Sequence, residues 1–380
     1  MVKKALGAGN FVSEWFGQRI YPTVRIDERR LVGDGNQRCP FLTDVLHAHT
    51  PCVKNTNSAG VCSVSSSSNG VRQDWLVCPY RVIDSEIVER ACQMVFGLDR
   101  KVAPIPVPLL KQVEERQKFE TRVARDGVGY VFFQDKLGGE ISVLGTSQSP
   151  ELSFDVTLVE VGIASDGRFK VLRYGILEIQ TMDYHGTYKH AVNNLRDGLR
   201  LHPGTFADSL RRNLERWSGE GVEGPNIANV FKRTFYQTLI KFKLAGDGAA
   251  AAGTVLALPR SVWDSWQPFL GAPVLADESN GIKRLLSTKG SAGDGSLNAF
   301  ICIFDLDAES RASTSPIRID HFIRVSPEQL AHHAFTQVPT NILDSLQGSG
   351  SVMSRIDARL GLWWPAFKPS TAPKERHRAG

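Results

Sequence analysis

Short apolar runs alternate with turn-forming residues between positions 128 and 185. The runs are rich in Val, Ile, Leu, Phe and Tyr, and they are separated by segments that contain Gly, Ser, Asp or Pro. This pattern is typical of β-strands. We therefore expect four strands in this part of the chain, at residues 130–133, 141–144, 153–161 and 171–181.

The apolar spacing changes to that of helices after Gly186. A helix that begins near Asn226 carries an apolar stripe that predicts core packing, formed by Ile227, Val230, Phe231, Phe235, Leu239 and Phe242. We expect further helices at 109–125, 187–201, 205–217, 261–270, 327–333 and 352–362, and further strands at 253–258, 299–306 and 317–325. This order of elements predicts an α/β fold in which a mixed β-sheet is flanked by helices.

Three regions are expected along the chain. Residues 1–100 contain five of the six cysteines and a turn-forming run at 65–70, so we predict an irregular segment that is held by a metal ion. Residues 101–365 hold the predicted strands and helices and form the main domain. Residues 366–380 are expected to be a disordered basic tail.

Composition limits the class of protein. The chain has 380 residues, of which 42% are hydrophobic and 22% charged, as in soluble globular proteins. It lacks an apolar run of bilayer length, and its first residues lack the apolar core of a secretory signal. We expect a cytoplasmic protein without a membrane partner, in which cysteines serve as thiols or metal ligands rather than disulfides.

Two of the expected strands carry acidic residues that suggest chemistry. Asp155 lies in the third strand, and Glu178 and Gln180 are two apart in the fourth, so they share one face. If the strands pair, two carboxylates and an amide come together, and this set suits Mg²⁺ and phosphodiester cleavage. The alternative interpretation is a solvated face of the sheet.

Basic residues follow the acidic strand. Between Gly186 and Lys243 there are ten Lys and Arg against five Asp and Glu, an excess equal to the net charge of the whole chain, +5. Basic helices beside an acidic centre suit a polyanionic substrate. Solvated helix faces are the alternative explanation.

Four cysteines form a second candidate site. Cys39, Cys52, Cys62 and Cys78 fall within forty residues of a loop-rich segment, although their spacing lacks the close pairs of zinc fingers. Four thiolates in a tetrahedron accept Zn²⁺ or Fe. The alternative is four unrelated buried thiols.

Other catalytic classes lack their motifs. The sequence contains no Gly-x-Ser-x-Gly elbow, no phosphate-binding loop with Lys-Ser or Lys-Thr, and no His-Glu-x-x-His. His185 follows the acidic strand, and we expect it to be structural or to contact phosphate.

Several long runs together resemble the NotI-type restriction endonucleases. The runs are 39–43 (CPFLT), 74–79 (DWLVCP), 133–140 (FQDKLGGE), 149–155 (SPELSFD), 174–192 (YGILEIQTMDYHGTYKHAV) and 223–237 (EGPNIANVFKRTFYQ). They occur in the same order as in that family, over residues from about 10 to 365.

The resemblance implies a restriction-endonuclease-like core of the PD-(D/E)xK superfamily. It assigns the active site to Glu140, Asp155, Glu178 and Gln180. Asp155 and Glu178 would bind Mg²⁺ with the carbonyl of Ile179, and Glu140 would help to hold that ion or a second one. Gln180 stands where the superfamily usually has lysine, and it would position the attacking water. The metal at the four cysteines would be iron, with zinc as the alternative.

The resemblance also implies the activity. We expect a type II restriction endonuclease that cuts both strands of GC-rich palindromic DNA at a site containing GGCC and leaves 5′-phosphates. A palindromic site calls for a homodimer, and the host would need a cognate DNA methyltransferase in a bacterial cytoplasm. Candidate DNA contacts are Lys189, His190, Lys232 and Arg233. Two alternatives remain open, a repair or mobile-element nuclease with the same core and a non-catalytic, metal-stapled DNA-binding protein.

Overall fold

The computed structural model describes residues 9–32, 37–68, 70–83, 85–184, 186–247, 250–278, 281–286, 298–307, 309–345, 352–364 and 366. The strands are β1 (Phe11–Trp15), β2 (Gln18–Arg19), β3 (Val61–Ser68), β4 (Val71–Leu76), β5 (Ile105–Pro106), β6 (Val128–Gln134), β7 (Ile141–Val143), β8 (Leu152–Phe154), β9 (Val156–Ile163), β10 (Phe169–Ile179), β11 (Ala251–Pro259), β12 (Leu275–Asp277), β13 (Ile282–Leu285), β14 (Ala299–Leu306) and β15 (Ile317–Arg324).

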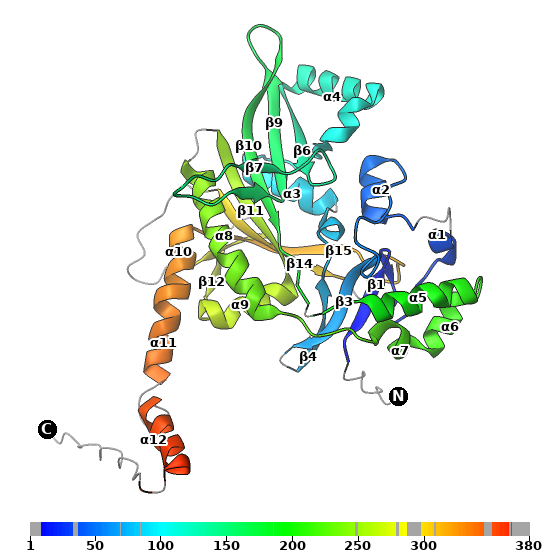
Figure 1. The fold of residues 1–380 in the computed structure, drawn as a ribbon. Coiled ribbons are helices and arrows are strands. Elements are labelled where there is room, and N and C mark those ends of the chain that lie inside the picture. Colours follow the sequence, from blue (N-terminus) through cyan, green and yellow to red (C-terminus); the bar gives the residue numbers. More distant parts are fainter. Residues whose placement is uncertain are drawn as a thin grey trace, which may run out of the picture.

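Helices lie between and after these strands (Figure 1). The α-helices are α1 (Glu28–Val32), α2 (Pro40–Leu46), α3 (Ser85–Phe96), α4 (Val113–Asp126), α5 (Lys189–Leu201), α6 (Phe206–Arg212), α7 (Leu214–Gly219), α8 (Ile227–Asp247), α9 (Arg260–Leu270), α10 (Pro327–His332), α11 (Val338–Ser345) and α12 (Val352–Trp363). Two 3₁₀ turns, η1 (Pro79–Val82) and η2 (Val107–Lys111), and the π-helical turn η4 (His333–Gln337) complete the described elements.

A nine-stranded mixed sheet forms the centre of the molecule. Its strand order is β12-β13-β15-β14-β11-β10-β9-β6-β5. The pairs β10–β11 and β11–β14 are parallel, whereas β6–β9 and β9–β10 are antiparallel. The predicted mixed α/β architecture, a large mixed sheet flanked by helices, is therefore confirmed.

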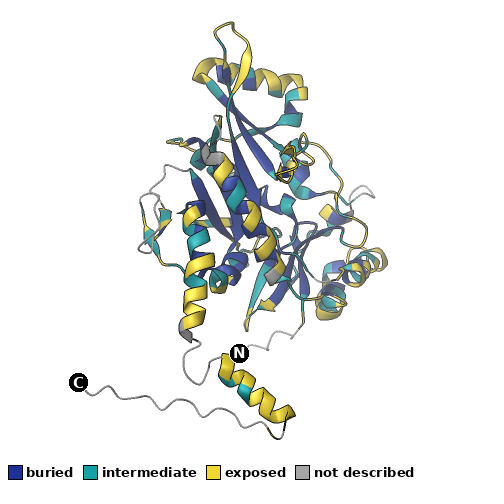
Figure 2. Cartoon of the chain, turned by 60° about the vertical axis from the view of Figure 1, so that its left-hand side comes forward, coloured by how far each residue is buried: buried dark blue, intermediate teal, exposed yellow. Residues whose placement is uncertain are grey.

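Different helices cover the two faces of this sheet. Side chains alternate between these faces along each strand, so neighbouring residues pack against different helices. On one face, Leu177 and Val255 pack against α3. On the other, Leu256 and Leu258 pack against α8 and α9. The central strands are consequently buried on both sides (Figure 2). The helix α3 comes so close to β10 that a Cβ at Gly175 would lie only 2.0 Å from Val95.

The expectation that residues 1–100 are irregular is wrong for the part of them that the structure describes. They form a four-stranded sheet of order β2-β1-β3-β4, in addition to α3. The serine-rich run, expected to be a turn, instead continues strand β3 as far as Ser68. Ser65 and Ser66 of this run are buried, whereas Ser67 is exposed, and the Ser66 hydroxyl donates to Asn10 Oδ1 at 2.6 Å.

Packing connects the chain across residue 100. The helix α3 lies on the large sheet, whereas α5, α6 and α7, which follow β10, pack on the small sheet around Trp15 and Phe206. A buried ion pair of 3.1 Å joins Arg81 to Glu14, and Arg81 also donates to the carbonyl of Ser315 beside β15. The small sheet is thus fastened to the large one through charged groups.

The C-terminal segment extends away from the sheets. In Figure 1, α11 and α12 (orange and red) lead outward from the body of the molecule. The predicted basic tail, residues 366–380, lies outside the described residues apart from position 366. Among the described helices, none combines the length and the apolar character that a bilayer span requires.

Candidate active site

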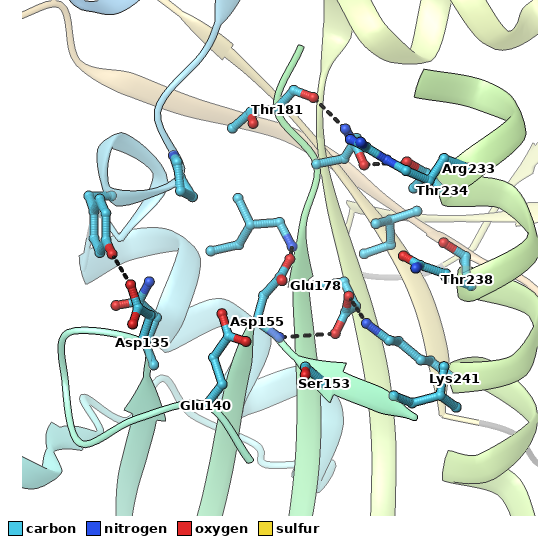
Figure 3. A pocket seen from close by; sticks show the side chains of 18 of the residues that line it. Asp135, Glu140, Ser153, Asp155, Glu178, Thr181, Arg233, Thr234, Thr238 and Lys241 are labelled. Carbon is cyan, nitrogen blue, oxygen red and sulfur yellow. Dashed lines mark hydrogen bonds and ion pairs between the residues drawn. The ribbon is translucent and has the colours of Figure 1, made fainter. Parts of the chain in front are cut away.

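A cavity of about 490 Å³ opens where β10 ends and α8 crosses the sheet. Its walls come from β8, the end of β10, the segment around Glu140 and one face of α8 (Figure 3). The lining is rich in charged and amide side chains, including Asp135, Glu140, Glu151, Asp155, Glu178, Gln180, Arg233 and Lys241.

Glu178 points into this cavity because of its position in β10. Leu177 and Ile179, its two neighbours, belong to the core under α3. By alternation, the Glu178 side chain must face the α8 side, where its strand partner Leu256 also lies. Glu178 is only 8% exposed.

Asp155 reaches the same place from a break between two strands. The single strand that we expected over 153–161 divides at Asp155 into β8, which pairs with β7, and β9, which belongs to the large sheet. The Asp155 carboxylate accepts a hydrogen bond of 2.9 Å from the Ile179 N–H. The Asp155 N–H in turn donates to Glu178 Oε1 at 3.3 Å. The second bond joins the two acids directly, and the first ties Asp155 to the residue that follows Glu178, so the acids lie side by side.

Burial raises the pKa of both acids, and at Glu178 the charge of Asp155 adds to it. Burial, and then the charge of Asp155, raise the pKa of Glu178 to about 7, although Lys241 acts in the opposite direction. Burial also raises the pKa of Asp155, against the Ile179 N–H and Lys241. A cation in the cavity would favour the ionised form of both groups.

Glu140 approaches the pair from the segment before β7. Its side chain points toward Asp155 in Figure 3. Most of the Glu140 side chain is exposed. The burial of its remaining part, and then the charge of Asp155, raise the pKa of its carboxyl. The structure therefore brings Glu140, Asp155 and Glu178, three of the residues that the resemblance assigns to the active site, to one cavity, and their catalytic role stays a prediction.

Gln180 lies in the cavity wall with both ends of its amide engaged. Its Oε1 accepts a hydrogen bond from the Thr234 hydroxyl of α8, and its Nε2 donates to the Thr181 carbonyl. In this arrangement the amide is held by protein groups. An amide has two N–H donors and two acceptor lone pairs, so these two bonds still allow the role expected for Gln180, positioning a water.

Lys241 is a member of the site that we did not single out in the sequence. It lies on α8, is buried, and its Nζ forms an ion pair with Glu178 Oε2. Figure 3 shows the side chain extending from the helix to the carboxylate. A signal was present: Thr234, Thr238 and Lys241 are spaced i, i+4, i+7 and form a polar line beside the apolar stripe of α8.

The oxygen donors of the cavity suit Mg²⁺. Asp155 and Glu178 are adjacent, and Ile179, whose carbonyl was the third expected ligand, is the last residue of β10. However, within the described ranges no three or more Asp, Glu, His or Cys side chains are grouped closely enough to hold a metal ion. The residue types therefore fit the ion, but Glu140 does not complete a three-carboxylate cluster.

The four N-terminal cysteines also converge without forming such a group. Cys39 precedes α2, Cys52 lies in the following loop, Cys62 is in β3 and Cys78 precedes η1. All four are free thiols. The thiols of Cys39, Cys52 and Cys78 lie within electrostatic range of one another, as do those of Cys62 and Cys78. Burial raises the pKa of Cys39 to about 12. The N-terminal metal site is thus not preformed in the described residues.

The candidate DNA-contacting residues separate into two groups. Arg233 lines the central cavity, and with Lys232 it also lines a neighbouring cavity of about 760 Å³. Arg233 forms an exposed ion pair of 2.6 Å with Asp183. Lys189 and His190, at the start of α5, are exposed and line neither cavity. His185 lies outside the described residues.

No family model matches the chain, and no curated protein matches it in sequence.

Proposed function

We propose that this protein is a Mg²⁺-dependent type II restriction endonuclease related to the NotI-type enzymes. It would hydrolyse phosphodiesters in GC-rich palindromic DNA and leave 5′-phosphates. The observation that supports the proposal best is the hydrogen bond from the Asp155 N–H to Glu178, next to that from the Ile179 N–H to the Asp155 carboxylate, in the wall of a polar cavity. These are the two acids to which the sequence resemblance assigns metal binding.

The residues of the cavity have distinct tasks in this proposal. Asp155 and Glu178 would hold Mg²⁺, and Glu140 would join them on a small movement of the exposed segment that carries it. When bound, Mg²⁺ would supply Lewis-acid stabilisation of the phosphate and a water of lowered pKa. Gln180 and Thr234 would keep the adjacent wall in place through their hydrogen bond.

DNA would follow the two adjoining cavities. The two cavities share Thr181 and Arg233, so a DNA backbone that enters one can continue into the other. Lys232 and Arg233 on α8 supply positive charge there, and phosphate contact is the role that we assign to them. A homodimer would place two such centres on a palindrome, and a cognate methyltransferase would protect host DNA.

The four N-terminal cysteines would bind a structural metal ion, iron or zinc. Support comes from the convergence of Cys39, Cys52, Cys62 and Cys78 from separate elements around the loop that precedes β3. Metal binding would deprotonate the thiols, and it would draw them into a tetrahedron.

Digestion of DNA of known sequence, followed by sequencing of the ends, tests the activity. The proposal predicts cuts at one recurrent GC-rich palindrome in Mg²⁺, 5′-phosphate ends and no cuts in EDTA. Cuts at DNA junctions or flaps without a common sequence would instead favour a structure-specific nuclease. DNA binding with no cutting in Mg²⁺ would favour a non-catalytic binding protein.

A further inference from the structure

Lys241 brings an ammonium group into contact with the acidic pair. The residue is 4% exposed, and its Nζ contacts Glu178 Oε2 while Oε1 accepts from the Asp155 N–H. Each carboxylate oxygen of Glu178 therefore has a partner, Lys241 of α8 for one and the Asp155 N–H between β8 and β9 for the other. The partners are 63 positions apart in the chain, so only the fold brings them together.

The setting of this ion pair differs from that of a core ion pair. Both members line the cavity, as do Thr234 and Thr238 on the same face of α8. Burying two charges contributes little to stability when compared with apolar residues of similar size. A buried pair at the wall of a polar cavity therefore points to a role in that cavity rather than in packing.

The neutral side chain at position 180 also favours a role for Lys241 in the cavity. Gln180 carries no charge, and its amide is bonded to Thr234 and Thr181. A positive charge beside the acids would orient them and would stabilise negative charge that develops on a phosphate. Lys241 supplies that charge from α8, on the same side of the sheet as Gln180.

We propose that Lys241 is the positioning cation of this centre. It holds the Glu178 carboxylate beside Asp155 in the orientation that receives Mg²⁺, and it takes over the charge that a lysine at position 180 would have provided. This inference rests on the proposed nuclease function for its catalytic part. The ion pair itself can be tested separately.

Steady-state cleavage with three variants tests the catalytic part. Lys241→Met should lower kcat by about 10²–10³-fold, while the Kd for DNA, measured in Ca²⁺, stays unchanged. Lys241→Arg should recover part of the lost kcat because it keeps the charge. Lys243→Met is the matched control, since Lys243 lies two residues further on α8 and pairs with the exposed Glu328; it should cut like the wild type. Wild-type kcat in Lys241→Met, or equal inactivity of the Met and Arg variants, would overturn the inference.

A double-mutant cycle tests the pair without any cleavage assay. Lys241→Met leaves the Glu178 carboxylate buried without its cationic partner, so the urea midpoint of this variant should fall. Adding Glu178→Gln to that variant should restore part of the loss. Additive effects would overturn the inference. If the cycle shows coupling but the wild type cuts no DNA, the proposed function fails and the pairing stands.

Discussion

Glu178 illustrates how one residue links the stability of this fold to its chemistry. Its carboxyl is buried, it touches both Asp155 and Lys241, and its pKa is raised from 4.5 to about 7. A group of this kind is costly to keep ionised in the folded chain. The fold retains it in the wall of a cavity that a cation can enter.

The raised pKa of Glu178 predicts a pH-dependent stability. The folded chain binds this proton more tightly than the unfolded chain, so the contribution is fully present below about pH 4.5 and is lost as the pH rises through about 7. In EDTA, the unfolding free energy should fall over this range by roughly 3 kcal/mol more in the wild type than in Glu178→Gln. Urea titrations at several pH values measure the difference, and parallel pH profiles would contradict the prediction.

At the scale of elements, α8 has three roles on adjoining faces. Its apolar stripe, which includes Val230 and Phe242, packs on the large sheet. Its polar line, Thr234, Thr238 and Lys241, lines the cavity, and Lys232 and Arg233 are exposed beside it. One helix thereby supplies core, cavity wall and positive surface.

The exposed charges of α8 should contribute to DNA affinity through phosphates. We expect Lys232→Ala/Arg233→Ala to weaken binding to all DNA sequences and to reduce the slope of log K against log salt by about 2. Lys118→Ala on α4 is the control, because Lys118 is exposed, pairs with Glu115 and lines neither cavity. Fluorescence anisotropy at several salt concentrations measures both slopes. An unchanged slope in the double variant, or an equal loss in the control, would count against this DNA path.

Most elements after residue 100 follow from the sequence because their apolar periodicity is strong. The expected strands at 253–258 and 299–306 correspond to β11 and β14, and the helix expected from Asn226 is α8. The first hundred residues do not show such a pattern. In β3, buried serines such as Ser63 and Ser66 take positions where apolar residues would mark a strand, and their hydroxyls are satisfied by Ser13 and Asn10, which are distant in sequence.

In the candidate site, too, the sequence did not indicate contacts that depend on how distant elements pack. Asp155, Glu178 and Gln180 share one short region of strands, and their spacing in sequence indicated a cluster. Lys241 entered only a count of basic residues, since its contact with Glu178 depends on how α8 crosses the sheet. Lys189 and His190 are exposed on α5, whose apolar face packs on the small sheet, and their contact with DNA stays a prediction.

At the scale of the molecule, buried charges connect the two sheets. Glu14 of β1 pairs with Arg81, which donates to the Ser315 carbonyl in the segment before β15. Removing one member of such a pair leaves the other buried without compensation. Arg81→Met should therefore lower the unfolding free energy by about 3–5 kcal/mol.

The control for Arg81 is an exposed pair. Arg168 contacts Asp166 at 2.6 Å on the surface, and Arg168→Met should cost less than about 1 kcal/mol. Urea unfolding of both variants compares them. Equal effects would show that Arg81 does not join the sheets energetically.

The cysteine cluster predicts a metal content. Purified protein should contain about one iron or zinc per chain, measured by elemental analysis, and Cys39→Ser should lose it. Cys302→Ser is the control, because Cys302 is buried in the core of the large sheet. A full complement of metal in Cys39→Ser would contradict a four-cysteine site.

Asp155 provides the most direct test of the central claim that this cavity cuts DNA. The decisive measurement is cleavage of a GC-rich DNA library in Mg²⁺ by the wild type and by Asp155→Asn, with DNA affinity measured in parallel in Ca²⁺. We predict recurrent cuts with 5′-phosphate ends for the wild type, and retained binding without cuts for Asp155→Asn. Equal cutting by the two proteins, or no cutting by the wild type, would contradict it.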